Sequence, residues 1–367
     1  MKASQMYQLS LQECADTIRT IGNKRTVLMR GHMGIGKSST LNMLAQDMPN
    51  HLPCYFDCTT KDLGDITIPN IKHMKDGSGF VRYLTNEELG VHNNRPIILM
   101  LDELGKANTA VKLAVMRICL DRKIGSYKLH PDSIVYATSN LGAEGVGDMF
   151  QGHQLDRMVT INVRKPDNME FIEYGVVNGF DPTLLAFCKD NSQLFHGFED
   201  YDDPEENPYI YHPRATRSAF CTPRSLHCAS DILKARIKHP EIYSDKVLTA
   251  ALMGAIGERT AMDMMAFVSL ADQLPTLESI KQDPQTAKVP TNASALCMVV
   301  YRSLVQIDKN WLNSWMEYIV RLPSESQAMF ANGVRAKNYS KRPMVMTNKK
   351  FTEWARLNNY MFSADKK

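Results

Sequence analysis

A glycine-rich loop contains the residues with the clearest capacity for chemistry in this chain. Residues 31–38 read Gly-His-Met-Gly-Ile-Gly-Lys-Ser, which fits the phosphate-binding pattern G-x-x-x-x-G-K-[ST]. Glycines let the backbone curl until successive N–H groups face one point and form a nest for an anion. Lys37 can reach the β- and γ-phosphates of a nucleotide, and the Ser38 hydroxyl can ligate Mg²⁺. The expected phosphate cradle consists of Gly31, His32, Met33, Gly34, Ile35, Gly36, Lys37, Ser38 and Ser39.

The segments on either side of this loop have the pattern that such a loop requires. Residues 26–30 form a short apolar run with β-branched residues at its start, which predicts a buried strand. Leu41, Leu44 and Met48 follow at helical spacing, and Pro49 ends the helix. A helix N-terminus adds its free N–H groups and its positive dipole end to the anion site. This context disfavours the alternative of a glycine-rich turn that binds nothing.

Two carboxylates follow the most hydrophobic run of the chain. Residues 97–101 read Ile-Ile-Leu-Met-Leu, apolar on both faces as in a central parallel strand, and Asp102 and Glu103 come directly after them. At the tip of such a strand Asp102 would hold Mg²⁺, and Glu103 would orient and polarise an attacking water. The alternative is that these acidic residues merely end a strand and begin a turn. The phosphate loop upstream makes this alternative less favoured.

Strands alternate with helices over the first 165 residues. Apolar runs at 53–58, 133–140 and 158–163 predict further strands, and the spacing at 9–21 and 109–120 predicts amphipathic helices. Such alternation is typical of an α/β fold in which right-handed crossovers place helices on both faces of a parallel sheet. The predicted fold class is therefore α/β in this part of the chain.

Beyond Pro166 the apolar spacing becomes helical. We expect an all-α section over residues 166–274, which a long, acidic, proline-bearing and exposed loop at 199–222 interrupts. A C-terminal helical extension is expected over residues 275–367. Together with the α/β core, residues 1–165, this makes three domains.

The composition excludes several classes of protein. The chain has 367 residues and a net charge of +3, which is too near neutral to argue for nucleic acid from charge alone. No apolar run approaches membrane-spanning length and no signal peptide is recognisable, so we expect a soluble, cytoplasmic protein. The eight cysteines lack any C-x-x-C spacing, which disfavours both a zinc site and a disulfide framework. His51, Cys54 and Cys58 could be imagined as metal ligands, but buried thiols are the favoured interpretation.

Taken as a set, these motifs resemble those of AAA+ ATPases. The phosphate loop, Leu-Asp-Glu at 101–103, Ala-Thr-Ser-Asn at 137–140, Leu-Asp-Arg at 155–157 and Thr-Pro-Arg-Ser at 222–225 occur in the order of that family. The resemblance covers about residues 9–270. It is closest to the MoxR-like branch, which is related to McrB-type, midasin and dynein modules.

The resemblance implies roles for residues outside the two motifs. Asn140 is similar to sensor 1, which helps to hold the attacking water near the γ-phosphate. Arg157 stands where the family has an arginine finger that reaches the nucleotide of the adjacent subunit. Arg224 resembles sensor 2 on the helical lid, with Arg217 as a competitor for that role. The implied catalytic set is Glu103, Asn140, Arg157 and Arg224; surface arginines in ordinary salt bridges are the alternative for the two arginines.

Two further segments follow from the resemblance, and one segment departs from it. Residues 62–80 correspond to an insert that faces the pore of a ring, and residues 123–129 resemble the β-hairpin before sensor 1. Residues 104–107 read Leu-Gly-Lys-Ala where MoxR-like sequences usually have Asn-Arg-Ala. Lys106 would replace that arginine as a point charge without bidentate geometry.

The implied activity is Mg²⁺-dependent hydrolysis of ATP in a homo-oligomeric ring, typically a hexamer, that remodels a protein partner. In this branch the partner often carries a von Willebrand factor A domain. A P-loop kinase that works as a monomer is one alternative, and a nucleic-acid motor or loader is another. The choice between ATP and GTP stays open.

Basic and aromatic side chains alternate near the C-terminus. Such interleaving between residues 335 and 360 could track single-stranded nucleic acid. We favour a solvated basic face over a helix whose Phe351, Trp354 and Leu357 belong to a core. Nucleic acid is therefore not the favoured partner.

Overall fold

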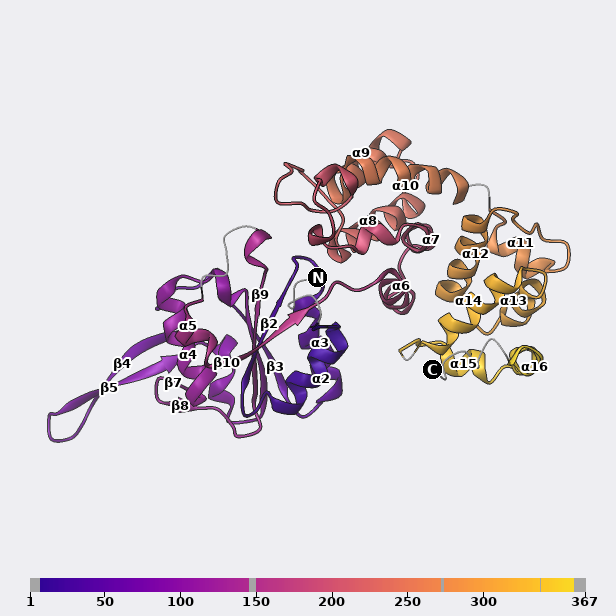
Figure 1. Ribbon diagram of the computed structural model, residues 1–367. Coiled ribbons are helices and arrows are strands. Elements are labelled where there is room, and N and C mark those ends of the chain that lie inside the picture. The colour runs from indigo at the N-terminus through magenta and orange to yellow at the C-terminus, as the bar shows by residue number, and fades with distance from the viewer. Residues whose placement is uncertain (1–6, 145–149, 272–273, 337, 360–367) are drawn as a thin grey trace. The chain divides into compact units, whose positions relative to one another are not determined.

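The structure is a computed structural model, which describes residues 7–144, 150–271, 274–336 and 338–359 (Figure 1). The chain divides into two compact units, Met1–Lys165 and Pro166–Lys367. Each unit has its own hydrophobic core among the described residues. No helix in these ranges is both long and apolar enough to cross a membrane.

A six-stranded parallel sheet forms the centre of the first unit. In spatial order its strands are β1 (Gln8–Leu9), β10 (Met158–Val163), β2 (Thr26–Gly31), β9 (Ile134–Ser139), β6 (Ile97–Asp102) and β3 (Leu52–Asp57). Every neighbouring pair is parallel, which confirms the predicted α/β fold class. Because β2, β9 and β6 are adjacent, their carboxyl ends meet at one edge of the sheet.

Helices cover both faces of this sheet (Figure 1). Three of them are α2 (Leu11–Ile21), α3 (Thr40–Asp47) and α4 (Thr109–Asp121). Alternate residues of β6 show how the chain divides its apolar side chains between the layers. Ile98 and Met100 pack in the cluster that includes α2 and α3, whereas Leu99 and Leu101 pack in the cluster with α4. All six residues of β6 are buried, which explains its unbroken apolar run.

The first helix begins two residues later than predicted. Leu9 pairs with Val163 in β1 rather than starting the helix. Ser10 caps α2, because its hydroxyl accepts the N–H of Glu13 while the Glu13 carboxylate accepts the N–H of Ser10. This capping box places the start of the helix at Leu11.

A long β-hairpin overlaps the segment that corresponds to the expected insert, residues 62–80. Its strands β4 (Thr67–His73) and β5 (Gly79–Thr85) pair antiparallel with each other alone and extend away from the body of the first unit (Figure 1). The apolar side chains that it exposes are Ile68, Ile71, Met74, Phe80, Val81, Tyr83 and Leu84. The pairing had no clear sequence signal, because apolar residues occur on both faces and no core-facing alternation marks the strands.

The smaller predicted hairpin is present. Its strands are β7 (Lys123–Ile124) and β8 (Tyr127–Lys128), and Gly125 at the turn has a left-handed backbone with φ +53°. Arg82 of β5 lies over the Tyr127 ring at 5.7 Å, so the two hairpins touch each other.

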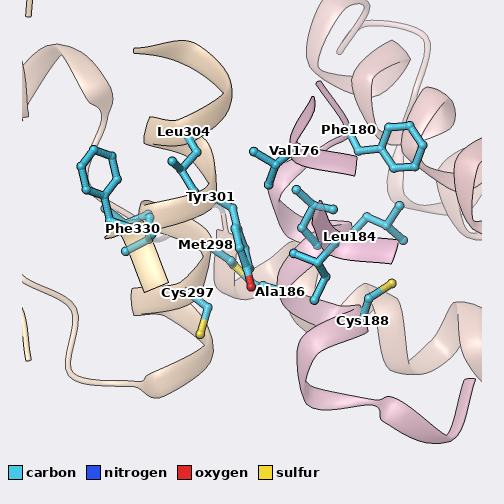
Figure 2. Packing of buried hydrophobic residues seen from close by; sticks show 14 of the residues in the cluster. Val176, Phe180, Leu184, Ala186, Cys188, Cys297, Met298, Tyr301, Leu304 and Phe330 are labelled. Atoms are coloured by element: carbon cyan, nitrogen blue, oxygen red, sulfur yellow. The ribbon is translucent and has the colours of Figure 1, made fainter. Parts of the chain in front are cut away.

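The second unit is helical throughout its described residues, apart from turns, loops and one isolated β-bridge. Its helices are α6 (Asn168–Val177), α7 (Pro182–Asp190), α8 (Pro223–Lys238), α9 (Asp245–Ile256), α10 (Glu258–Ala271), α11 (Leu277–Gln282), α12 (Ala293–Gln306), α13 (Leu312–Ile319), α14 (Ser324–Arg335), α15 (Arg342–Met346) and α16 (Lys349–Leu357). Figure 2 shows Leu184 and Ala186 of α7 facing Met298 and Tyr301 of α12. One core cluster therefore runs across residue 275, and the division of this unit into a lid and an extension stays a prediction.

The acidic loop at 199–222 is folded onto the second unit, so the expectation of an exposed loop was wrong for much of it. Ile210 and Cys221 are buried and joined by the isolated bridge. The Arg217 guanidinium donates to the carbonyl oxygens of Pro204 and Ile210, each at 2.6 Å. A guanidinium can satisfy the carbonyls of an irregular backbone in this way, which is why the loop holds a shape with only short 3₁₀ turns, such as Pro204–Glu206, and no strand.

The C-terminal aromatic residues are mostly core residues. Phe351 and Trp354 of α16 are buried, as predicted. Leu357 is 76% exposed, and its assignment to the core was wrong, because it lies in the last turn of α16. Lys337 and Tyr360, which belong to the same basic and aromatic stretch, lie outside the described residues.

Candidate active site

The phosphate loop connects the end of β2 to a helical turn. Gly34 and Gly36 have left-handed backbones, with φ +70° and +98°, which side chains rarely adopt. Ile35 between them is buried in the core beneath the loop. The helix after the loop begins as a 3₁₀ turn, Lys37–Ser39, and continues as α3, so the α-helix proper starts three residues after Lys37.

Five of the predicted site residues form a cluster at the carboxyl edge of the sheet, which consists of two hydrogen-bonded groups. Lys37 Nζ donates to Asn140 Oδ1 at 2.6 Å. Ser38 Oγ donates to Asp102 Oδ2 at 3.3 Å, and Asn140 Nδ2 donates to Glu103 Oε2 at 3.1 Å. The loop after β2, the tip of β6 and the tip of β9 thus bring together the two carboxylates, the amide, the amine and the hydroxyl.

The Lys37 amine is buried beneath the loop. Its Nζ also donates to the carbonyl oxygens of Gly31 at 2.8 Å and of His32 at 2.7 Å. Burial lowers the pKa of Lys37 to about 8, although neighbouring carboxylates, that of Glu103 foremost, act to raise it. A phosphate oxygen near this amine would stabilise its protonated form and so offset the cost of burying the charge.

Asp102 is held by two residues that the sequence did not single out. Thr138 Oγ1 donates to Asp102 Oδ1, and the Tyr55 hydroxyl donates to Asp102 Oδ2 at 2.9 Å. Burial, with the neighbouring Asp102 carboxylate second, raises the pKa of Tyr55, so the phenol remains a donor. Asp102 and Ser38 present hard oxygen atoms side by side, and this donor set fits Mg²⁺.

Glu103 has an unusual backbone at the end of β6. Its φ of +51° is uncommon for a residue with a side chain, and such strain persists only where neighbours impose it. The Thr138 hydroxyl accepts the Glu103 N–H at 3.0 Å. Lys106 Nζ lies 3.0 Å from Glu103 Oε2, so the residue at which this chain departs from MoxR-like sequences pairs with the expected catalytic carboxylate.

A third carboxylate reaches the phosphate loop, and no pattern in the sequence indicated it. Glu144 ends a 3₁₀ turn, Gly142–Glu144, that follows β9. Its Oε2 accepts the Met33 N–H at 2.7 Å, and its Oε1 lies 2.5 Å from His32 Nδ1. Two members of the predicted cradle are thus engaged by a side chain from more than a hundred residues away.

Arg157 lies far from its own chain's phosphate loop. It is exposed and directly precedes β10, where Met158 is in register with Thr26 and Val163 with Gly31. Five strand steps of about 3.3 Å therefore separate its end of the sheet from the loop, roughly 17 Å. The side chain is at the wrong end of the sheet to join the cluster around Lys37 of the same chain.

The two candidates for sensor 2 lie in the second unit. Arg224 is exposed in the first turn of α8, whose N-cap is Thr222. Arg217 is largely buried against the backbone of its own loop, where carbonyl oxygens bind both of its terminal nitrogens. Of the two, Arg224 alone has a side chain that is available to a ligand.

The chain was compared with known proteins. No model of a protein family matches it, and no curated protein does. Among solved structures it is similar to a presumed ATPase from Cytophaga hutchinsonii, with 13% identity, a TM-score of 0.34, and 70% of this chain and 88% of that chain covered. It is also similar to the RuvB Holliday junction branch migration motor of Thermotoga maritima, with 12% identity, a TM-score of 0.36, and 83% and 86% covered. A mutant of the same RuvB matches with 13% identity, a TM-score of 0.35, and 84% and 91% covered. Because all three TM-scores are below 0.5, the function has to be inferred from the chain's own residues.

Proposed function

We propose that this chain is a Mg²⁺-dependent ATPase of the AAA+ type, in its MoxR-like branch, which works as an oligomeric ring and remodels a protein partner. The observation that carries the proposal is the convergence of Lys37, Ser38, Asp102, Glu103 and Asn140 at one edge of a parallel sheet. A structural salt-bridge network would not need a glycine loop with two left-handed residues at the same place. A phosphoryl-transfer site needs both the cluster of polar side chains and the glycine loop.

Each side chain of the cluster has a task in this reaction. Backbone N–H groups of the loop and the Lys37 amine would bind the phosphates, and Ser38 and Asp102 would hold Mg²⁺, which neutralises charge on the phosphate oxygens. Asn140 and Glu103 would orient a water in line with the γ-phosphorus. The water oxygen bonds to phosphorus as the bond to the bridging oxygen breaks, ADP and inorganic phosphate leave, and Glu103 takes up the proton of the water.

Arg157 acts in trans in this proposal. It is exposed, and about 17 Å of sheet separate it from its own phosphate loop, so only a second copy of the chain could use it at a nucleotide. An arginine finger contributes roughly 10³ to 10⁵ in rate, about 4–7 kcal/mol of barrier. Arg224 would contact the γ-phosphate from the helical unit.

The hairpin of β4 and β5 is the proposed contact with the protein partner. It exposes seven large apolar side chains, and its outer edges offer unpaired backbone groups in the described residues. Surfaces of this kind mark protein interaction sites. The aromatic residues at the C-terminus offer less to nucleic acid, since Phe351 and Trp354 are buried.

Size-exclusion chromatography with light scattering tests the proposal. With Mg²⁺ and a non-hydrolysable ATP analogue the protein is expected to elute as a closed oligomer. Glu103→Gln is expected to bind ATP and assemble but to release phosphate at least about 100-fold more slowly, because the proton acceptor is gone. Arg157→Ala is expected to lose hydrolysis as well. Mixing it with Lys37→Ala is expected to restore part of the hydrolysis, at interfaces where one subunit supplies Lys37 and its neighbour supplies Arg157.

Two results would contradict the proposal. A monomer that hydrolyses ATP at full rate would remove the ring and the role of Arg157, and would favour a phosphotransferase. A Glu103→Gln variant with unchanged turnover would remove Glu103 from its role. Lys24→Ala, at an exposed position in the turn before β2, is a control that should leave assembly and turnover unchanged.

A further inference from the structure

The Glu144 carboxylate occupies part of the phosphate loop. Its Oε2 accepts the backbone N–H of Met33 at 2.7 Å, and its Oε1 lies 2.5 Å from His32 Nδ1. The Glu144 side chain is only 2% exposed and that of His32 10%. A buried carboxylate that binds a backbone N–H of an anion nest stands in the chemical position of a phosphate oxygen.

The basic group of the loop is also occupied by the protein itself. Lys37 donates to the Gly31 and His32 carbonyl oxygens and to Asn140. Glu144 is among the carboxylates whose charge acts on the Lys37 amine and raises its pKa. Both the Met33 N–H and the Lys37 amine therefore already have hydrogen-bond partners within the chain.

An incoming triphosphate meets this arrangement with negative charge of its own. Asp102 and Glu103 belong to the proposed chemistry, because one would hold Mg²⁺ and the other would take up a proton. Glu144 has no such task, and its carboxylate contacts the Met33 N–H and the His32 ring rather than the proposed metal ligands. Like charges at close range in a buried site repel strongly. Glu144 and a bound triphosphate therefore favour different arrangements of the loop.

We propose that Glu144 is an internal competitor of the nucleotide: its carboxylate holds the phosphate loop in a closed arrangement, and a triphosphate has to displace it on binding. This inference rests on the proposed function, because it concerns the regulation of the same site. The apparent dissociation constant of the nucleotide is then the intrinsic constant divided by the fraction of molecules in which Glu144 has left the loop. A partner or neighbouring subunit that draws Glu144 away would raise the affinity for nucleotide.

The opposite role for Glu144 would be that of a brace. A brace keeps the loop in the shape that nucleotide needs, so its removal weakens binding, whereas removal of a competitor strengthens binding. Whether nucleotide affinity rises or falls when the Glu144 carboxylate is removed therefore distinguishes a competitor from a brace. Glu144→Gln suits the test, because its amide oxygen can still accept the Met33 N–H while the negative charge is gone.

The experiment measures binding of a non-hydrolysable ATP analogue with Mg²⁺ by isothermal titration calorimetry. Glu144→Gln is expected to bind about tenfold more tightly than the natural protein, the ratio for a loop that is open in about one molecule in ten. Glu87→Gln removes one charge at an exposed position of the same unit and is expected to bind like the natural protein. Glu144→Ala removes both charge and hydrogen bonds and is also expected to bind more tightly. Far-UV circular dichroism verifies that each variant is folded.

Unchanged or weaker binding by folded Glu144→Gln and Glu144→Ala would overturn the inference and leave the proposed function in place. A second probe, inorganic tripolyphosphate, has the phosphate chain of ATP without its base. It therefore distinguishes a loop that does not bind phosphate from a site that does not recognise the nucleotide base. The melting temperature is expected to rise more with tripolyphosphate for Glu144→Gln than for the natural protein. If neither nucleotide nor tripolyphosphate binds to any of the proteins, the proposed function and the inference both fall.

Discussion

Individual side chains in the first unit hold the site by contacts between neighbouring strands of the sheet. Asp102 receives hydrogen bonds from Thr138 and Tyr55, so its two oxygens are oriented before any metal arrives. Glu103 keeps a left-handed backbone whose N–H the Thr138 hydroxyl accepts. One threonine therefore positions the Asp102 carboxylate and the Glu103 backbone, and pre-organisation of this kind lowers the reorganisation needed during catalysis.

Cysteine reactivity tests the packing at the residue scale. Seven of the eight thiols are buried and Cys228 is exposed. Burial raises the pKa of Cys14 to about 12 and that of Cys54 to about 11, so at pH 8 they form almost no thiolate, the reactive species. Iodoacetamide at pH 8 is expected to alkylate Cys228 at least about tenfold faster than the others, as peptide mass spectrometry would measure.

Cys228→Ser is the matched control, because it should remove the fast reaction and leave the slow ones unchanged. Rapid alkylation of Cys14 or Cys54 in the folded protein would contradict the packing of the first unit. In denaturant all eight cysteines should react at similar rates.

Among the elements, β6 and the hairpin of β4 and β5 are both rich in apolar residues, but β6 buries them and the hairpin exposes them. Every side chain of β6 is buried between helix layers, and Asp102 at its tip reaches the site. The hairpin buries little and exposes apolar side chains on both of its faces. The first element stabilises the unit, and the second is available to a partner.

Removal of the hairpin tests that contrast. Thr67 and Thr85 are cross-strand partners, so two glycines can replace residues 68–84 and connect them. Because the removed side chains are largely exposed, the melting temperature is expected to change by less than about 4 °C, and nucleotide binding should persist. Leu99→Ala in β6 is expected to cost about 2–5 kcal/mol, which lowers the melting temperature by several degrees more.

A melting temperature that falls as far without the hairpin as in Leu99→Ala would contradict the assignment of the hairpin as a peripheral element. Differential scanning calorimetry of the two variants beside the natural protein makes the comparison. If stimulation of the ATPase by a protein partner is found, it should be lost when the hairpin is replaced.

At the scale of the whole molecule, the chain consists of two units with separate cores. The core cluster of the second unit draws all of its residues from beyond Pro166, and both clusters of the first unit lie before it. The cluster in the second unit includes Trp311, Trp315 and Phe330, which are large and fully buried (Figure 2 shows part of it). A core of that kind is what an independently folding domain requires.

A fragment of residues 166–367 is therefore expected to fold alone. It should show the far-UV circular dichroism of a helical protein and a single cooperative thermal transition. Phe187→Ala, which removes a fully buried ring, is expected to destabilise the fragment by about 3–5 kcal/mol. A fragment without a cooperative transition would show that its core depends on the first unit.

The sequence by itself determined the phosphate loop, the central strand with its two terminal carboxylates, and the division into an α/β half and a helical half. These features are local: a glycine pattern, an unbroken apolar run and a change of apolar spacing are each visible within some twenty residues. The same local signals predicted the strand ends that carry Asp102 and Asn140, because parallel strands align their carboxyl ends.

Only the tertiary structure decided how Tyr55, Thr138 and Glu144 enter the site, since each makes its contact with a residue at least 36 positions away. Such contacts depend on which strands lie side by side, and the residues next to Tyr55, Thr138 or Glu144 in the sequence do not indicate the distant partner. The same reason explains the acidic loop, whose carbonyl groups are satisfied by Arg217, and the exposed pairing of β4 with β5. A hydrogen bond between distant residues becomes possible only when the fold has brought both partners to one place.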